Sequence, residues 1–148
     1  MDSLSKLTQI DNLIRDGKIS QAKSILLSIK LNQIKRIEVS KLADFARRLR
    51  MNLWGLRLLR PLVRSEQPVH PAVTEEELVT YAGLLIKIGA HAEARELLKN
   101  RVSTTNPSAL LFQSQLLFAE WNYLQALPLL AMGQKLKTIP NTRKLYFK

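Results

Sequence analysis

The sequence predicts an all-α fold of about four antiparallel helix hairpins stacked side by side, and two observations predict it. Apolar residues recur at helical spacing along most of the 148 residues. Four segments also repeat one pattern, in which a turn residue is followed five positions later by a small residue. The small residues are Ala22, Gly55, Ala94 and Ala126, at intervals of 33, 39 and 32 positions. A period in this range indicates stacked helical hairpins, because each hairpin buries its apolar face only against its neighbours.

The repeated pattern has a physical reason. Two antiparallel helices approach closely only where a small side chain lets their backbones come together. A residue that ends the first helix, most favourably glycine, permits the tight turn between them. The four turn residues are Gly17, Arg50, Gly89 and Trp121. Large aliphatic residues four positions after each small residue are expected to fill the space between hairpins, and these are Leu26, Leu59, Leu98 and Leu130.

The first two hairpins are predicted at residues 3–31 and 33–64. Asp2 or Ser3 is expected to cap the first helix, which Gly17 ends. The second hairpin is expected to begin near residue 33 and to turn at 50–52. The residues expected on the buried stripe of its first helix are Ile37, Leu42, Phe45, Ala46 and Leu49.

The third and fourth hairpins are predicted at residues 74–101 and 107–138. Thr74 and Glu77 form a T-x-x-E capping box at the start of the third. Asn106 and Pro107 suit the N-cap and first position of the fourth. Residues 65–73 contain two prolines and are expected to form a loop. Residues 139–148 are expected to form a capping helix or the start of a further repeat.

Composition excludes several classes of function. The chain has no cysteine, two histidines and no phosphate-binding or metal-binding motif. We therefore expect a protein that is not an enzyme and has no cofactor and no metal site. No apolar stretch is long enough to cross a membrane, and the N-terminus lacks a signal-peptide pattern, so a cytoplasmic location is expected. Nothing in the sequence specifies an oligomeric state.

The net charge of +11 is unevenly distributed. Residues 30–64 carry ten basic and two acidic side chains, whereas residues 65–120 carry four basic and seven acidic ones. Such asymmetry indicates an acidic partner or a polyanion. Arg57, Arg60 and Arg64 are expected to form one stripe along a helix face, and guanidinium groups suit the capture of carboxylates and phosphates. Trp54 and Trp121 are expected to pack in the core or between hairpins.

Small and large residues alternate on the first helices of two hairpins in a way that resembles the tetratricopeptide repeat. The residues that carry the resemblance are Val39, Leu42, Ala43 and Ala46 in the second hairpin, and Leu78, Tyr81, Ala82 and Leu85 in the third. The resemblance covers about residues 3–140, and its weaker matches, in the first and fourth hairpins, are Lys6, Gln9, Gln113 and Ser114. It implies a right-handed solenoid that forms a single domain over residues 1–148.

In tetratricopeptide arrays the first helices of successive hairpins line a concave groove that holds a peptide or a partner helix. The resemblance implies that the groove-facing residues here are Asp11, Arg15, Asp44, Arg47, Arg48, Glu76, Gly83, Lys87, Gln115 and Phe118. Arg15, Arg48 and Lys87 hold one equivalent place on three successive helices and would form a ladder of cations. Leu7 and Asp11 stand where the family's clamp for chaperone tails has lysine and asparagine.

We therefore expect an adaptor or scaffold protein whose basic groove binds an acidic segment of another protein. Two alternatives remain open. The arginine stripe is consistent with a helical repeat that binds nucleic acid, and the small size is consistent with a secretion-type chaperone. The face that carries the arginines distinguishes the first two readings, because a convex stripe favours a phosphate backbone and a concave one favours a peptide.

Overall fold

The computed structural model describes residues 3–136, and within this range it contains eight α-helices, two 3₁₀ turns and no strand. The predicted all-α class is therefore confirmed. Residues 139–148, which the sequence predicts as a capping helix or a further repeat, lie outside the described residues. The elements are α1 (Ser3–Arg15), α2 (Ile19–Ser28), η1 (Leu31–Gln33), η2 (Arg36–Glu38), α3 (Val39–Arg48), α4 (Asn52–Val63), α5 (Glu75–Lys87), α6 (His91–Arg101), α7 (Pro107–Ala119) and α8 (Tyr123–Leu136).

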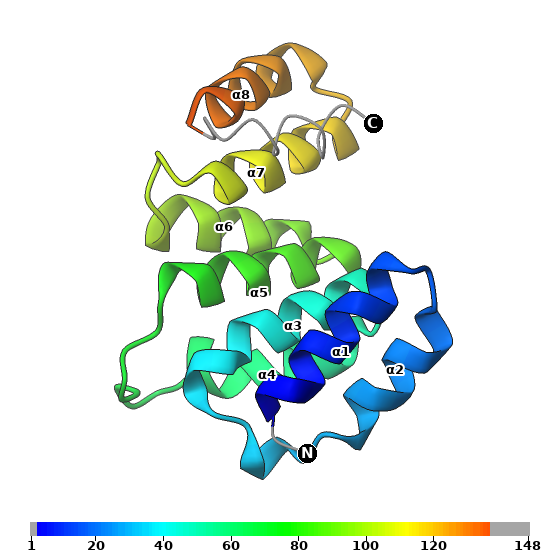
Figure 1. Cartoon of the computed structure of the whole chain (residues 1–148). Coiled ribbons are helices and arrows are strands. Elements are labelled where there is room, and N and C mark those ends of the chain that lie inside the picture. Colours follow the sequence, from blue (N-terminus) through cyan, green and yellow to red (C-terminus); the bar gives the residue numbers. More distant parts are fainter. Residues whose placement is uncertain (1–2, 137–148) are drawn as a thin grey trace.

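The helices pack in consecutive antiparallel pairs, α1 with α2, α3 with α4, α5 with α6, and α7 with α8 (Figure 1). The first helices of the pairs lie side by side and run in the same direction, with α3 packed on α1 and α5, and α5 packed on α7 (Figure 1). The second helices close the gaps behind them, since α4 contacts α5 and α6 contacts α7. α5 is thus enclosed by four helices, which is why nine of its thirteen residues are buried.

The four turns within the pairs share one backbone geometry. Gly17, Arg50, Gly89 and Trp121 all adopt the left-handed conformation, with φ of 75°, 61°, 84° and 63°. Each donates its N–H to the carbonyl three residues back, and the next residue donates to the carbonyl five residues back. This pair of bonds is the Schellman motif, which satisfies the free carbonyls at a helix C-terminus. The repeated sequence pattern therefore marks four copies of one turn.

The small residues that follow these turns are buried, as the pattern predicts. Ala22, Ala94 and Ala126 are fully inaccessible to solvent, and Gly55 is buried. At Gly55 an added Cβ atom would lie 2.9 Å from the Leu84 side chain and 3.3 Å from the Ala46 Cβ atom. These distances leave no room for a larger residue, because α4 passes close to both α3 and α5 there.

The core consists of two clusters that meet at α3 and α4. The first joins α1 and α2 to α3 and includes Ile10, Leu26 and Phe45. The second centres on α5 and extends to α7, and includes Leu84, Leu98 and Phe112. Ile34 and Leu58 pack against both clusters. Hydrophobic contact is therefore continuous from α1 to α7 and holds the helices that form the site in fixed positions.

Two sequence expectations are wrong. Ile37, expected on a buried stripe, is 86% exposed, because the segment before Val39 forms the 3₁₀ turns η1 and η2 and the α-helical period begins only at Val39. Trp121, expected in the core, is 79% exposed, because its left-handed turn conformation directs the side chain outward. Trp54 packs against the cluster around Phe45, as expected.

Candidate functional site

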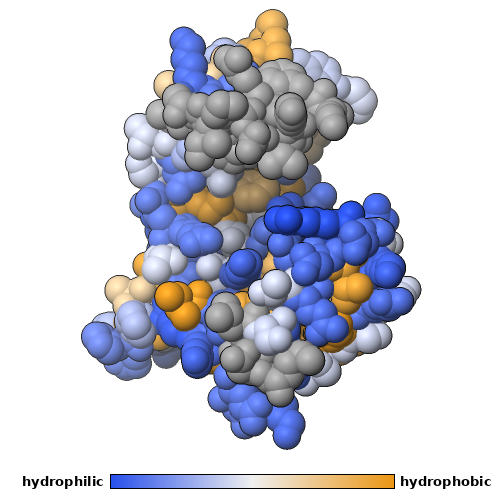
Figure 2. Space-filling model, viewed as in Figure 1, coloured by the Kyte–Doolittle hydropathy of each residue, from blue (hydrophilic) through white to orange (hydrophobic). Residues whose placement is uncertain are grey.

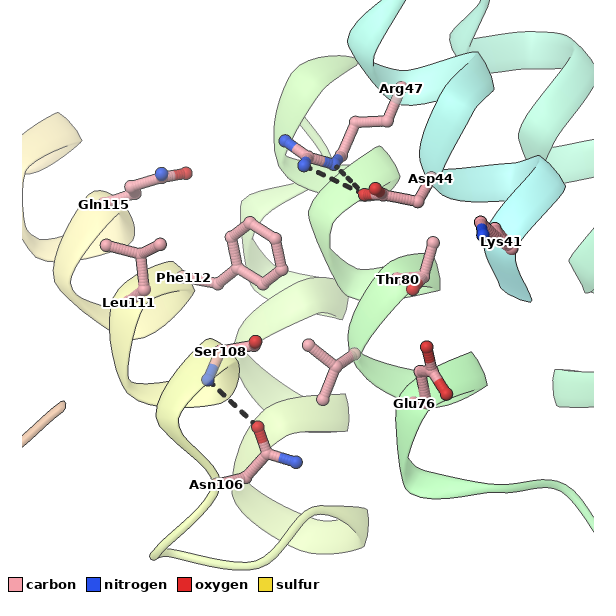
Figure 3. A pocket seen from close by; sticks show the side chains of 11 residues that line it. Lys41, Asp44, Arg47, Glu76, Thr80, Asn106, Ser108, Leu111, Phe112 and Gln115 are labelled. Carbon is pink, nitrogen blue, oxygen red and sulfur yellow. Dashed lines mark hydrogen bonds and ion pairs between the residues drawn. The ribbon is translucent and has the colours of Figure 1, made fainter. Parts of the chain in front are cut away.

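Three first helices, α3, α5 and α7, contribute side chains to one groove of about 640 Å³ (Figure 3). Figure 3 shows the three rows of side chains facing one another across it. We call this site the α3–α5–α7 groove. It is lined by Lys41, Asp44, Arg47, Glu76, Val79, Thr80, Asn106, Ser108, Leu111, Phe112 and Gln115.

Helical periodicity explains how each helix supplies its row. Lys41, Asp44 and Arg47 recur every three residues on α3, and Ser108, Leu111, Phe112 and Gln115 recur every three or four residues on α7. Residues at these intervals share one face of an α-helix. The first helices α3, α5 and α7 also run in the same direction (Figure 1). One face of each therefore contributes to the lining of the groove.

Two capped helix starts fix one end of the groove. Thr74 Oγ1 accepts a hydrogen bond from the Glu77 N–H at 3.1 Å, and the Thr74 N–H donates to Glu77 Oε1 at 2.8 Å, which completes the predicted capping box. Asn106 Oδ1 accepts from the N–H groups of Ser108 and Ala109 at 3.0 and 3.1 Å. These caps set where α5 and α7 begin, and so set the positions of Glu76 and Ser108 in the groove.

Phe112 and Arg47 form the central contact of the groove. The Arg47 guanidinium carbon lies 5.5 Å from the centre of the Phe112 ring, and Arg47 Nη2 donates to Asp44 Oδ1 at 2.9 Å. Gly83 makes this contact possible, because an added Cβ atom there would lie 2.8 Å from Phe112 and 3.2 Å from Arg47. The Phe112 ring is only 7% exposed, and it forms a buried part of the groove wall beneath the Arg47 guanidinium.

The lining of the groove carries as many acidic as basic side chains. Lys41 and Arg47 are basic, and Asp44 and Glu76 are acidic. Lys41 also lies near the Phe45 ring, at 6.0 Å from its centre. The lining therefore has no net charge, whereas the sequence predicts a basic groove. Any excess of positive charge near the groove must come from residues outside its lining.

The expected groove residues fall into three sets. Four of them line the groove, namely Asp44, Arg47, Glu76 and Gln115. Gly83 is buried beneath the groove, where an added Cβ atom would contact Phe112 and Arg47. The remaining five lie outside the lining, and these are Asp11, Arg15, Arg48, Lys87 and Phe118.

The expected ladder of cations lies at the C-terminal ends of α1, α3 and α5. Arg15 and Arg48 share one carboxylate, with Arg15 Nη2 at 3.1 Å and Arg48 Nη1 at 3.9 Å from the Asp11 oxygens. Lys87 is exposed at the end of α5. The centre of the Phe118 ring lies 5.5 Å from the centre of the Tyr123 ring. This contact joins α7 to α8, so Phe118 does not face the groove. The three cations of the ladder therefore lie outside the lining, and the single negative charge of Asp11 offsets one of the two arginine charges.

None of the other seven lining residues was predicted from the sequence as part of the groove. The missed residues are Lys41, Val79, Thr80, Asn106, Ser108, Leu111 and Phe112. The helical period did carry a signal for them, because Lys41 and Phe112 lie three residues before Asp44 and Gln115, which were identified. The apolar residues of this set resemble core positions in sequence, and only the tertiary arrangement distinguishes them.

The predicted arginine stripe lies on α4, away from the groove. Arg64 is paired with Glu93 of α6, and its guanidinium carbon lies 6.0 Å from the centre of the Tyr81 ring. Burial lowers the pKa of Arg64, but its contacts with Tyr81 and Glu93 raise it, and the net shift is upward. Arg57 and Arg60 are exposed. Only these two of the three arginines therefore remain exposed and without an ion pair to a described residue.

Comparison with protein-family models, with curated proteins and with solved structures gives no match. Within residues 3–136, no helix combines the length and the apolar character needed to cross a membrane. The same described part of the chain contains no group of three histidine, cysteine or acidic side chains that could hold a metal ion.

Proposed function

We propose that this chain is a protein-interaction module, a right-handed solenoid of tetratricopeptide-like hairpins whose α3–α5–α7 groove binds a segment of another protein. One observation carries the proposal: three successive first helices direct matching faces into a single groove. The four identical turns and the buried small residue after each support the repeat architecture. A regular groove of this kind suits an extended or helical peptide, which presents side chains at regular intervals.

The chemistry of the groove defines the partner segment. The half-buried Leu111 supplies most of the accessible apolar surface of the groove, because Phe112 and Val79 are only 7% and 4% exposed. Figure 2 shows hydrophobic residues in the recess below α7, whereas hydrophilic residues dominate the face over α1 and α3. Beyond the lining, Arg48 and Lys87 add positive charge at the C-terminal ends of the helices. We expect an apolar anchor residue next to acidic residues, because the anchor would supply affinity and the charges would set direction.

Selection of a random peptide display library on the immobilised protein tests the proposal. Enriched peptides should combine an apolar residue with acidic ones, and Leu111→Asp should weaken their binding by at least about tenfold. Gln115→Glu should weaken it through repulsion, whereas Gln125→Glu, the same change on exposed α8 outside the lining, should not. Binding that survives Leu111→Asp would show that the peptides use another surface.

Nucleic-acid binding is the alternative that the same protein can test. Binding of the protein to labelled single-stranded and double-stranded oligonucleotides can be followed by fluorescence anisotropy across a salt series. We expect no binding near physiological salt, because only Arg57 and Arg60 of the stripe are both exposed and without an ion pair to a described residue. Tight binding that persists there and is weakened by Arg57→Gln would favour the nucleic-acid function instead.

A further inference from the structure

A second pocket, of about 360 Å³, lies between α4 and α6 over α5. It is lined by Leu56, Arg60, Arg64, Tyr81, Leu85, Ile88 and Glu93. We call it the α4–α6 pocket. On α5 its residues Tyr81 and Leu85 belong to a different stripe from Glu76 and Thr80, which line the α3–α5–α7 groove. The two sites therefore use different faces of the same helix.

The interior of the α4–α6 pocket is apolar. Leu56, Leu85 and the Tyr81 ring form it, and Ile88 is 47% exposed at its edge. An aliphatic residue left half in water at the edge of an apolar cavity gains free energy when a ligand covers it. The volume lies at the small end of the range for ligand sites, so the apolar part of the ligand must be short.

Three charged side chains line the pocket and form its rim, since all three are exposed or partly exposed, and Arg60, Arg64 and Glu93 together carry a net charge of +1. Arg64 and Glu93 form an ion pair, and Arg64 is also held over the Tyr81 ring. Arg60 has no ion pair or hydrogen bond to a described residue, so its guanidinium donors remain available. A carboxylate suits such a group, because both of its oxygens can accept hydrogen bonds from one guanidinium.

We infer that the α4–α6 pocket binds a free short-chain aliphatic carboxylate, with the chain against Leu56, Leu85 and Ile88 and the carboxylate on Arg60. The negative charge of the carboxylate balances the net positive charge of Arg60, Arg64 and Glu93. The aliphatic chain of the ligand replaces water at the exposed side of Ile88. This site does not depend on the proposed groove function, since the two share no lining residue.

Titration with sodium hexanoate, followed by NMR of ¹³C-labelled isoleucine methyl groups, tests the inference on the full chain. The Ile88 methyl signal should shift and saturate at millimolar hexanoate. Hexan-1-ol and hexylamine should bind at least about tenfold more weakly. The alcohol offers Arg60 one neutral acceptor in place of two anionic oxygens, and the protonated amine offers no acceptor and repels the guanidinium. The variant Leu111→Asp, in the other site, should leave the hexanoate affinity unchanged.

Arg60→Gln and Arg57→Gln form the matched pair of variants. Both arginines are exposed on α4, but only Arg60 lines the pocket. Hexanoate affinity should fall about tenfold in Arg60→Gln and stay unchanged in Arg57→Gln. Equal losses in the two variants, or no saturable Ile88 shift, would overturn the proposal. Tighter binding of a tripeptide with a C-terminal leucine than of hexanoate would also overturn it, because the ligand would then be a protein terminus.

Discussion

The Arg36 guanidinium and the Glu77 carboxylate form a bidentate ion pair between residues 41 positions apart. Arg36 Nε donates to Glu77 Oε2 at 2.8 Å and Arg36 Nη2 donates to Glu77 Oε1 at 2.7 Å. The same guanidinium donates to the carbonyl oxygens of Pro71 and Ala72, at 2.5 and 3.3 Å. Since Glu77 is also the capping-box residue of α5, one arginine joins the turn η2, the 65–73 loop and the start of α5. This pair holds one wall of the α3–α5–α7 groove in place.

Removal of Arg36 should strongly destabilise the protein. The Glu77 side chain is only 3% exposed, so Arg36→Leu leaves a buried carboxylate without its charged partner. We expect the free energy of unfolding to fall by about 2–4 kcal/mol, measured by urea denaturation. Lys35→Leu, which removes an exposed cation from the neighbouring position, should cost less than about 0.5 kcal/mol. Equal losses in the two variants would mean that the ion pair contributes nothing specific.

The same ion pair predicts how stability depends on pH. Burial raises the pKa of Glu77, but the hydrogen bonds from Arg36 and Thr74 and the attraction of Arg36 lower it more, so it lies below its ordinary value of 4.5. A carboxyl group whose pKa is lowered by folding stabilises the protein above its unfolded pKa, and the stabilisation is lost as pH falls through the folded value.

We therefore expect the difference in stability between the wild type and Glu77→Gln to be constant from pH 7 to about pH 5 and to shrink at lower pH. Urea denaturation at a series of pH values measures it. Glu76→Gln is the control, because Glu76 is exposed on the first turn of α5 and makes no hydrogen bond or ion pair to a described residue, and its difference from the wild type should stay small throughout. A difference for Glu77→Gln that grows in acid would contradict the lowered pKa.

At the four left-handed turn positions, substitution to glycine should stabilise the protein and substitution of glycine by alanine should destabilise it. Arg50 holds a φ of 61°, which is unfavourable for a residue with a Cβ atom, so Arg50→Gly should raise the free energy of unfolding by about 0.5–1 kcal/mol. Gly89→Ala should lower it by about 1 kcal/mol, and the cost is purely conformational because no atom lies within 4 Å of the added Cβ. Thermal and urea unfolding measure both. A destabilised Arg50→Gly would show that contacts of the Arg50 side chain outweigh its backbone strain.

Gly83→Ala should alter the groove more than the stability. The new methyl group would displace Phe112 and Arg47, whereas the gain in helix propensity, up to about 1 kcal/mol, offsets part of the cost. We expect changed chemical shifts for the Phe112 ring protons and weaker binding of selected peptides. Gly133→Ala is the matched control, since its Cβ would meet only ordinary contacts at 3.6 Å and should stabilise α8. An unchanged Phe112 spectrum in Gly83→Ala would show that the groove has more room than its geometry indicates.

The local geometry of this protein follows from patterns within short segments of its sequence. The positions of the four turns, the buried small residue after each, and the capping box of Thr74 and Glu77 are all present in the sequence pattern. They could be predicted because a Schellman turn and a helix cap depend on hydrogen bonds between residues a few positions apart, and because the helical period places apolar residues on one face.

Contacts between side chains of different helices depend instead on how the helices pack together. Arg36 reaches Glu77 because the turns η1 and η2 replace the expected helix start, and the same change leaves Ile37 in solvent. Phe112 lines the groove because Gly83 of another helix leaves space for its ring. Such contacts depend on the relative positions of helices, which result from the packing of the whole core. No pattern within one segment specifies them, since apolar residues of the same spacing are found in both core and groove, and charged residues of the same spacing are found in both groove and outer surface.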